Sequence, residues 1–238
     1  MAVGGNTKLV LFDIDGTLLS IAERELNVFG LALERVFGTA GSIEAYSFAG
    51  KTDHQIAFEL LSGAGRAASQ IELGLPDLKD CYLEMLDEML DTSGMAVLPG
   101  VIELLDQLAK DSSVVLGLQT GNWEAAAEKK LARFGLARYF VVGAFGDGQL
   151  DRNTLPPLAR DRAEQRVGGR ISSSHTVIVG DTALDIACAR TWHMASVGVA
   201  TGSTSQLELR SAGADLVVPT LADLDAGRLL GLTSRKPS

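Results

Sequence analysis

Short, continuous runs of apolar residues recur along the chain and alternate with longer segments of helical periodicity. Unbroken apolar runs of this length are typical of parallel strands, because helices cover both faces of such a sheet. The segments between them follow the spacing i, i+3, i+4, i+7 of a buried helix face, as in Val101-Leu104-Leu105-Leu108 and Ala127-Lys130-Leu131-Phe134. The alternation predicts a doubly wound α/β fold with a Rossmann-like parallel sheet core, whose strands we place at residues 9–12, 114–118, 140–142, 177–179, 196–199 and 216–218.

One region departs from this rhythm, because residues 20–93 have helical periodicity but no convincing strand. Its clearest stripes, which we interpret as the core of a helical bundle, are Leu26-Phe29-Leu33-Phe37 and Tyr82-Met85-Leu86-Met89. The sequence therefore predicts an α/β core formed by residues 1–19 and 94–238, and an inserted α-helical cap domain formed by residues 20–93.

Two carboxylic acids, Asp13 and Asp15, directly follow the first predicted strand, in the segment Phe12-Asp13-Ile14-Asp15-Gly16-Thr17. Ligands of open α/β sheets bind beyond the carboxyl ends of the strands, so both side chains are expected in the active-site crevice. Two acids in that position can divide their labour, one as a nucleophile and the other as an acid and base. The plainer alternative is a turn that ends the strand, with Gly16 as its flexible residue.

A second acidic pair follows the strand predicted at residues 177–179, in Gly180-Asp181-Thr182-Ala183-Leu184-Asp185. We expect Asp181 at the end of that strand and Asp185 one turn into the next helix. Together with Asp13 they can converge on one hard cation, and Mg²⁺ prefers few carboxylates completed by water and phosphate oxygens. The alternative is helix capping, with Asp181 as the N-cap residue and Asp185 as an acid in the first turns.

Two weaker signals stand at other expected loops. Thr120-Gly121-Asn122 follows the strand predicted at residues 114–118 and precedes a helix, so a hydroxyl and two backbone amides can donate hydrogen bonds to a phosphate. Arg152 stands on a loop before the helix expected near Leu155 and offers a cation. Taken singly, these are ordinary turn and surface residues.

The amino-acid composition and net charge limit the kinds of molecule that the protein is expected to bind. The 238 residues include 46% hydrophobic residues, enough for a sizeable core, and carry a formal net charge of −9. Nucleic acid and anionic membranes are bound by clustered Lys and Arg, so neither is expected as a partner, whereas a small phosphorylated metabolite is compatible. Cys81 and Cys188 stand far apart and form no disulfide or metal motif, and no signal or membrane-spanning run occurs. We therefore expect a cytoplasmic monomer or homodimer.

The order of these motifs resembles that of the haloacid dehalogenase superfamily of aspartate-nucleophile phosphohydrolases, especially its phosphoglycolate-phosphatase-like members. The resemblance spans nearly the whole chain, and the predicted helical insertion takes the place of that family's small cap. It implies a Mg²⁺-dependent phosphatase that hydrolyses a small phosphate monoester, such as a phosphoglycolate-like compound, a sugar phosphate or a nucleotide, through an aspartyl-phosphate intermediate.

The resemblance also implies roles for the four acids. Asp13 attacks phosphorus, and Asp15 protonates the leaving alcohol and then activates water. Mg²⁺ is bound by the Asp13 carboxylate, the Asp15 backbone carbonyl and Asp181, with Asp185 either a further ligand or an organiser of the ligands.

Phosphate oxygens are held, by the same resemblance, by Thr120 and a basic residue, with Gly121 and Asn122 beside them. The family's third motif is more often a lysine followed by proline, which this chain lacks in the right interval. We therefore assign Arg152 to that motif, with Arg160 as its competitor.

Lys51 stands in the predicted cap, in Phe48-Ala49-Gly50-Lys51-Thr52-Asp53-His54, where similar enzymes carry a substrate-selecting loop. It is a candidate to bind an anionic leaving group. The plainer alternative for this segment is a turn in which Thr52 or Asp53 caps a helix that begins near Gln55.

Other functions fit parts of the pattern. A β-phosphoglucomutase-like phosphosugar mutase and a phosphonoacetaldehyde-hydrolase-like phosphonatase share these motifs, although Lys51 stands two positions early for the phosphonatase's Schiff-base lysine. A phosphate-responsive binding module on the same fold needs no intact set of acids, whereas all four are present here. Dehalogenation is disfavoured, because the dehalogenases themselves lack the second acid that Asp15 supplies.

Overall fold

The computed structural model describes residues 7–21, 23–92 and 94–233. Within these residues six parallel strands form one sheet in the order β3-β2-β1-β4-β5-β6. The strands are β1 Lys8–Phe12, β2 Val114–Gln119, β3 Val142–Ala144, β4 Thr176–Gly180, β5 Ala195–Val199 and β6 Leu216–Val218. The predicted α/β fold with a parallel sheet is confirmed.

Helices cover both faces of this sheet, which explains why its strands are continuous apolar runs. Leu9 and Leu11 of β1 pack against α6 and α7. The intervening Val10 and Phe12 face the opposite layer of helices, and all four side chains are fully buried. One layer contains α6 (Leu155–Val167), α7 (Ala183–Thr191) and α8 (Gln206–Ser211), and the other contains α4 (Val101–Leu108), α5 (Glu124–Arg133) and α9 (Ala226–Leu232). No described helix is long and apolar enough to cross a membrane.

The largest shift from a predicted strand is at β3, which was expected at residues 140–142 and lies at Val142–Ala144. The preceding residues are used differently, because Ala137–Tyr139 form a 3₁₀ turn. Phe140 then packs edge-on against Phe12, with 6.1 Å between the ring centroids. Phe140, the first residue of this apolar run, therefore packs in the core, and the strand begins only at Val142, the last residue of the run.

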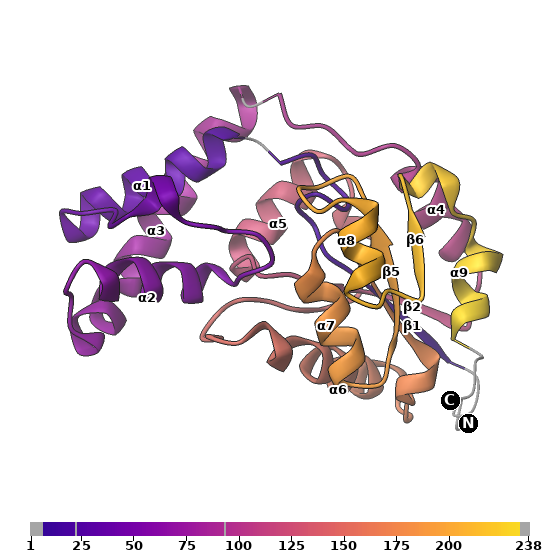
Figure 1. Cartoon of the computed structure of the whole chain (residues 1–238). Coiled ribbons are helices and arrows are strands. Elements are labelled where there is room, and N and C mark those ends of the chain that lie inside the picture. The colour runs from indigo at the N-terminus through magenta and orange to yellow at the C-terminus, as the bar shows by residue number, and fades with distance from the viewer. Residues whose placement is uncertain (1–6, 22, 93, 234–238) are drawn as a thin grey trace.

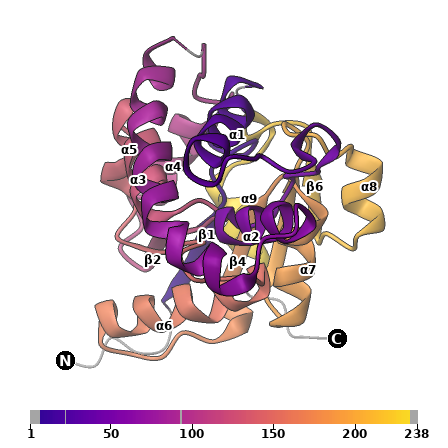
Figure 2. The same cartoon turned by 90° about the vertical axis from the view of Figure 1, so that its left-hand side faces the viewer.

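Three of the helices between β1 and β2, namely α1 (Glu23–Phe37), α2 (Asp53–Gly63) and α3 (Ala68–Thr92), lie together to one side of the sheet (Figures 1 and 2). Phe29 and Tyr82 pack α1 against α3, with ring centroids 5.4 Å apart. The predicted helical insertion is thus observed over the described residues. Its division from the core as a separate domain stays a prediction, and residue 93 at the boundary lies outside the described residues.

A tight contact joins the inserted helices to the core beside the sheet's carboxyl edge. The Asp53 amide donates to the Gly121 carbonyl at 2.8 Å, and the Asp53 carboxylate accepts from the Trp123 amide at 2.8 Å. A Cβ atom on Gly121 would lie only 2.1 Å from the Lys51 carbonyl oxygen, so glycine alone permits this approach. The predicted cap of α2 is confirmed for Thr52, whose hydroxyl accepts from the Gln55 amide at 3.0 Å.

Candidate active site

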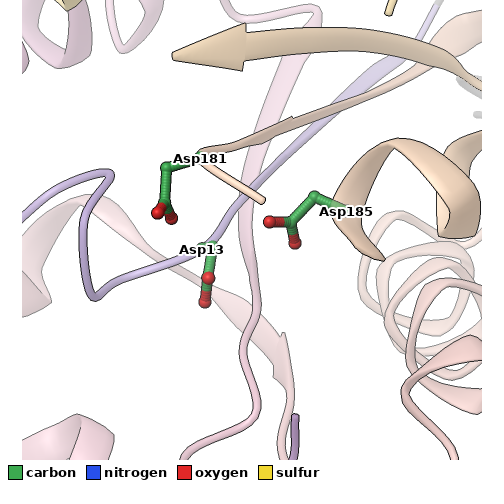
Figure 3. A group of neighbouring side chains, drawn as sticks. All are labelled: Asp13, Asp181 and Asp185. Atoms are coloured by element: carbon green, nitrogen blue, oxygen red, sulfur yellow. The ribbon is translucent and has the colours of Figure 1, made fainter. Parts of the chain in front are cut away.

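The central strands β1 and β4 end side by side, where connections leave the sheet in opposite directions, and ligands of α/β sheets bind at such a point. Asp13 follows β1 and Asp181 follows β4, and the Asp13 amide donates to the Val179 carbonyl at 3.0 Å. One oxygen from each of Asp13, Asp181 and Asp185 lies within 4.8 Å of the others (Figure 3). The structure therefore brings three of the predicted site carboxylates together, and all three are buried.

A buried guanidinium links two of these carboxylates. Nη2 of Arg152 lies 2.9 Å from Oδ2 of Asp13 and 2.6 Å from Oδ1 of Asp185, and the side chain is 4% exposed. Burial alone would lower the pKa of Arg152, but the two carboxylates raise it, so the group stays a cation. Arg160 instead donates to the Ser173 hydroxyl at 3.1 Å. Of the two competing arginines, Arg152 is the one that reaches the acidic group.

Both oxygens of Asp185 are engaged by neighbours. Oδ1 accepts from Arg152, and Oδ2 accepts from the amide and the hydroxyl of Thr182 at 3.1 and 2.7 Å. Thr182 in turn caps α7 through the Asp185 amide, which completes a capping box. The alternative with Asp181 as the N-cap residue is wrong, because Thr182 holds that position. Asp185 is thus arranged to orient Arg152 and α7 rather than to offer a free oxygen.

The Asp181 carboxylate is enclosed by two glycines. A Cβ atom on Gly16, whose φ is +80°, would lie 2.5 Å from Oδ2 of Asp181, and one on Gly202 would lie 1.7 Å from the same oxygen. The hydroxyl of Thr17 donates to Oδ1 of Asp181 at 3.2 Å. Oδ2 of Asp181 therefore lies in a cradle formed by the backbone of the two glycines, where any larger residue would clash with it. The carboxylate of Asp13 lies beside this cradle.

The electrostatics of this group are compatible with a bound cation. Burial raises the pKa of Asp181 to about 8, with further contributions from Asp13 and Asp185, against the opposing charge of Arg152. Burial also raises the pKa of Asp13 to about 6, again opposed by Arg152. Crowded, dehydrated carboxylates whose pKa values are raised in this way are stabilised by a hard divalent ion, and the residues present fit Mg²⁺.

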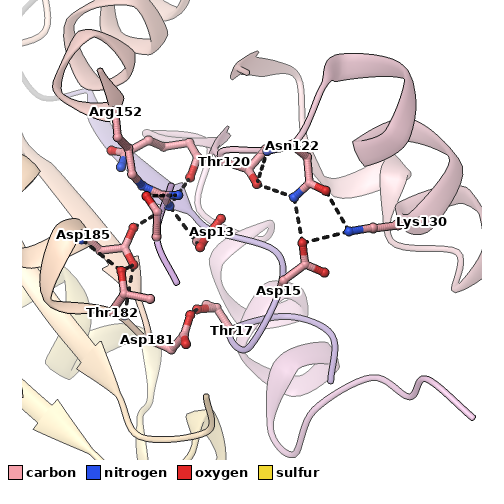
Figure 4. A network of polar contacts seen from close by, with 12 residues as sticks. Asp13, Asp15, Thr17, Thr120, Asn122, Lys130, Arg152, Asp181, Thr182 and Asp185 are labelled. Carbon is pink, nitrogen blue, oxygen red and sulfur yellow. Dashed lines mark hydrogen bonds and ion pairs between the residues drawn. The ribbon is translucent and has the colours of Figure 1, made fainter. Parts of the chain in front are cut away.

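Asp15 enters a second network (Figure 4). Its Oδ2 accepts from Nζ of Lys130 at 2.9 Å and from Nδ2 of Asn122 at 2.7 Å, and Lys130 also donates to Oδ1 of Asn122 at 2.7 Å. Oδ1 of Asp15 is buried, and among the described residues it has no hydrogen-bond partner. One oxygen of Asp15 is therefore held by two donors, while the other accepts no hydrogen bond from the described residues.

Lys130 was not singled out from the sequence as a site residue. Its side chain is fully buried, and it occupies the i+3 position of the helix stripe that begins at Ala127. A lysine on a buried helix face needs a polar partner, so its place in that stripe was the available signal. The partner could not be named, because Asp15 is 115 positions away in the sequence.

Thr120 lies at the same junction and supports the Asn122 side chain. Oγ1 of Thr120 accepts from Nδ2 of Asn122 at 2.8 Å and from the Asn122 amide at 3.3 Å, and a hydroxyl that accepts twice still has a proton to donate. The Asn122 amide is thus used inside the loop. Thr120 and Gly121 both line the cavity above the carboxylates.

A cavity of about 350 Å³ opens over these groups, between the sheet edge and the inserted helices. Lys51 lines it, and its Nζ lies 2.6 Å from Oε2 of Glu59 and 3.0 Å from the Tyr46 hydroxyl. Residues from both parts of the chain contribute to the wall, among them Asp13, Asp15, Thr120, Gly121, Asn122, Arg152 and Asp181 from the core, and Phe29, Tyr46, Phe48, Lys51 and Tyr82 from the insertion. A substrate in the cavity would contact both.

Comparison with known proteins gives consistent matches. A family model of haloacid dehalogenase-like hydrolases matches residues 10–199. Phosphoglycolate phosphatase from Vibrio parahaemolyticus is 27% identical over 228 residues, which cover 91% of this chain and 94% of that protein. The phosphoglycolate phosphatase from Agrobacterium fabrum is 29% identical over 242 residues, which cover 95% and 94%.

Solved structures share the fold. A HAD hydrolase of family IA, variant 3, from Entamoeba histolytica superposes with a TM-score of 0.71 at 20% identity and covers 96% of this chain and 100% of its own. A predicted phosphoglycolate phosphatase from Haemophilus somnus has a TM-score of 0.66 at 21% identity and covers 92% of this chain and 96% of its own. The parallel sheet with inserted helices is thus common to these proteins.

Proposed function

The chain belongs to the haloacid dehalogenase-like hydrolases, and we propose that it hydrolyses a small phosphate monoester with Mg²⁺, through an aspartyl phosphate on Asp13. The observation that carries the proposal is the buried contact of Arg152 with Asp13 and Asp185, beside Asp181. A nucleophile, a phosphate-binding cation and metal-binding carboxylates thus share one cavity. The relatives named as phosphoglycolate phosphatases support this reaction class.

In the first step, a carboxylate oxygen of Asp13 attacks phosphorus, and the bond from phosphorus to the alcohol oxygen breaks. Arg152, 2.9 Å from Oδ2 of Asp13, orients the nucleophile and offers its remaining N–H groups to the phosphate. The Thr120 hydroxyl and the Gly121 amide donate to other phosphate oxygens. Such fixed donors stabilise the charge of the transferring group without reorganising during the reaction.

Asp15 serves both steps as the proton carrier. It protonates the leaving alcohol, then takes a proton from the water that attacks the phosphorus of the aspartyl phosphate, which releases phosphate and restores Asp13. This role needs a carboxylate that lines the cavity and whose orientation is fixed. Contacts of Oδ2 with Lys130 and Asn122, and the position of Asp15 in the wall of the cavity, support it.

Asp13, the backbone carbonyl of Asp15 and Asp181 would hold Mg²⁺, and Asp185 would keep Arg152 in place. When bound, the ion supplies positive charge that neutralises the phosphate and the attacking carboxylate. The cradle that Gly16 and Gly202 form around Oδ2 of Asp181 supports this assignment.

Mg²⁺ binding is expected to weaken as pH falls below about 8, because protons compete for Asp181 first and for Asp13 nearer pH 6. The apparent affinity should drop by up to about tenfold per pH unit while one proton is displaced. Calorimetric titrations of the protein with Mg²⁺ at several pH values measure this change in affinity. An affinity that does not change between about pH 6 and about pH 8 would contradict the assignment of Asp181.

The metal-free protein should show the same linkage in its stability. Both carboxyls have raised pKa values, so between about pH 4 and about pH 8 the folded chain binds more protons than the unfolded chain, and stability falls as pH rises. Asp181→Asn should flatten part of this slope in thermal unfolding, and should lose most of the stabilisation by Mg²⁺. An unchanged slope in this variant would show that Asp181 ionises normally.

Replacement of Arg152 by lysine is expected to lower kcat/KM about 10²-fold to 10³-fold, because a point charge cannot bridge two carboxylates and a phosphate as a planar guanidinium does. Arg160→Lys is the matched control, since Arg160 contacts the Ser173 hydroxyl instead, and it should keep wild-type activity. Equal losses in both variants would argue against a specific role for Arg152.

Phosphate release from a panel of small phosphomonoesters, with and without Mg²⁺, tests the proposed function itself. We expect turnover that needs the metal ion and disappears with a chelator. Interconversion of sugar phosphates without net phosphate release would instead favour the mutase, and no release from any ester would contradict the proposal.

A further inference from the structure

Aromatic side chains of the inserted segment form one side of the cavity. Phe29, Tyr46, Phe48 and Tyr82, here called the aromatic wall, all line it. Their rings contact one another, with centroids 6.2 Å apart for Phe29 and Phe48, and 5.4 Å apart for Tyr46 and Phe48. Ile21 and Ile56 line the same cavity. The phosphate-binding groups of the core thus face a surface that is suited to an apolar partner.

The cations at this cavity are already paired. Among the described residues that line it, Lys51 and Arg152 are the basic ones. Arg152 is held by carboxylates of the core, as described above. Nζ of Lys51 lies 2.6 Å from Oε2 of Glu59 and 4.2 Å from the centroid of the Tyr46 ring. A leaving group that carries its own carboxylate would have to break this pairing to find a cation.

Glu59 is held in its ionised form. Although partial burial acts in the opposite direction, hydrogen bonds from Lys51, Tyr46 and Gln55 lower the pKa of Glu59. The Lys51–Glu59 pair therefore has no net charge. The lining residue Asp53 adds a carboxylate, which repels an anionic leaving group further.

We propose that the leaving group of the substrate is an uncharged alcohol bearing a flat apolar ring, which stacks on the aromatic wall. This inference rests on the proposed phosphatase function and narrows it, and it makes phosphoglycolate a poor substrate. The cavity of about 350 Å³ falls within the range that holds ring-bearing ligands. Aromatic rings prefer offset or edge-on contacts with one another, and Tyr46 and Phe48, the partly exposed members of the wall, can provide such contacts.

Three esters of primary alcohols test the inference, because their leaving groups differ in ring and charge but little in chemical type. Benzyl phosphate should have a kcat/KM about 10-fold to 100-fold above that of ethyl phosphate, since burial of a ring is worth that much. Phosphoglycolate should be the slowest of the three. A kcat/KM for phosphoglycolate equal to or above that for benzyl phosphate overturns the inference, even though the phosphatase function then stands. No hydrolysis of any ester overturns the proposed function, and the inference with it.

Substitutions in the inserted segment test whether the aromatic wall causes the preference for benzyl phosphate. Phe48→Ala should lower the ratio of kcat/KM for benzyl phosphate to that for ethyl phosphate about tenfold. Phe58→Ala is the matched control, because Phe58 is a partly buried phenylalanine of α2 that is not among the residues lining the cavity, and the ratio should not change. An unchanged ratio in Phe48→Ala would overturn the inference.

The charge argument has its own test in Glu59→Gln, which releases Lys51 from its partner. This variant should raise kcat/KM for phosphoglycolate about tenfold, chiefly through a lower KM, while benzyl phosphate changes little. If Lys51→Met instead lowers phosphoglycolate turnover in the otherwise wild-type protein, Lys51 already binds the carboxylate, and the inference is wrong.

Discussion

Asp13→Asn is expected to lower kcat for phosphate-ester hydrolysis by at least about 10⁴-fold, because the amide cannot form the acyl phosphate on which the proposed mechanism depends. The substitution changes little in shape, and Arg152 keeps its contact of 2.6 Å with Asp185. It also removes a buried carboxyl whose pKa burial raises to about 6, so the variant should be at least as stable as the wild type near neutral pH. Phosphate release at saturating Mg²⁺ is the measurement.

Asp161→Asn provides the control for this variant, because Asp161 is exposed on α6, away from the acidic group. It should retain wild-type turnover. A kcat for Asp13→Asn within about tenfold of the wild type would rule out Asp13 as the nucleophile, since the loss of a covalent step cannot cost so little.

Lys130→Met is expected to lower kcat about 10²-fold while KM changes little, because Lys130 positions Asp15, the proposed proton carrier, and does not line the cavity that binds the substrate. Its ammonium lies 2.9 Å from Oδ2 of Asp15 and 2.7 Å from Oδ1 of Asn122. Without it, the Asp15 carboxylate keeps, among the described residues, only the hydrogen bond from Asn122, and it can turn away from the leaving group. Methionine fits the buried helix face that the lysine stem occupies, so the fold should persist.

Lys129→Met is the matched control for Lys130, because the neighbouring lysine points elsewhere and pairs with Asp87. It should leave both kcat and KM unchanged. Equal losses of kcat in the two variants, or a loss confined to KM in Lys130→Met, would show that Lys130 does not position Asp15.

The parallel sheet could be predicted because its signal is local. A strand buried on both faces, such as β1, must be apolar throughout, and Leu9 to Phe12 satisfy this within the printed sequence. The same rule misplaced β3, because the apolar side chain of Phe140 packs against Phe12 in the core, although Phe140 is not part of the strand. Local hydrophobicity records burial, but it does not record which partner a side chain meets.

Part of the candidate site could likewise be predicted from the sequence, and part of it could not. Asp13 and Asp181 follow strands, so the edge on which they lie could be predicted from the order of elements alone. Whether Arg152 or Arg160 reaches them depends on how α6 and the turn before it lie against the sheet, which the sequence alone does not determine. Capping by Thr182 in place of Asp181 was missed because both residues are good N-caps and stand side by side.

The central claim is the covalent aspartyl phosphate, and its most direct test uses Asp15→Asn with p-nitrophenyl phosphate. That ester needs no acid to release its alcohol, whereas breakdown of the intermediate still needs the base that Asp15 provides. The account predicts a rapid burst of about one nitrophenolate per protein molecule, followed by slow turnover, and a phosphoryl group that mass spectrometry locates on Asp13 after acid quenching. Slow, linear release without a burst, or a phosphoryl group on another residue, would contradict the account.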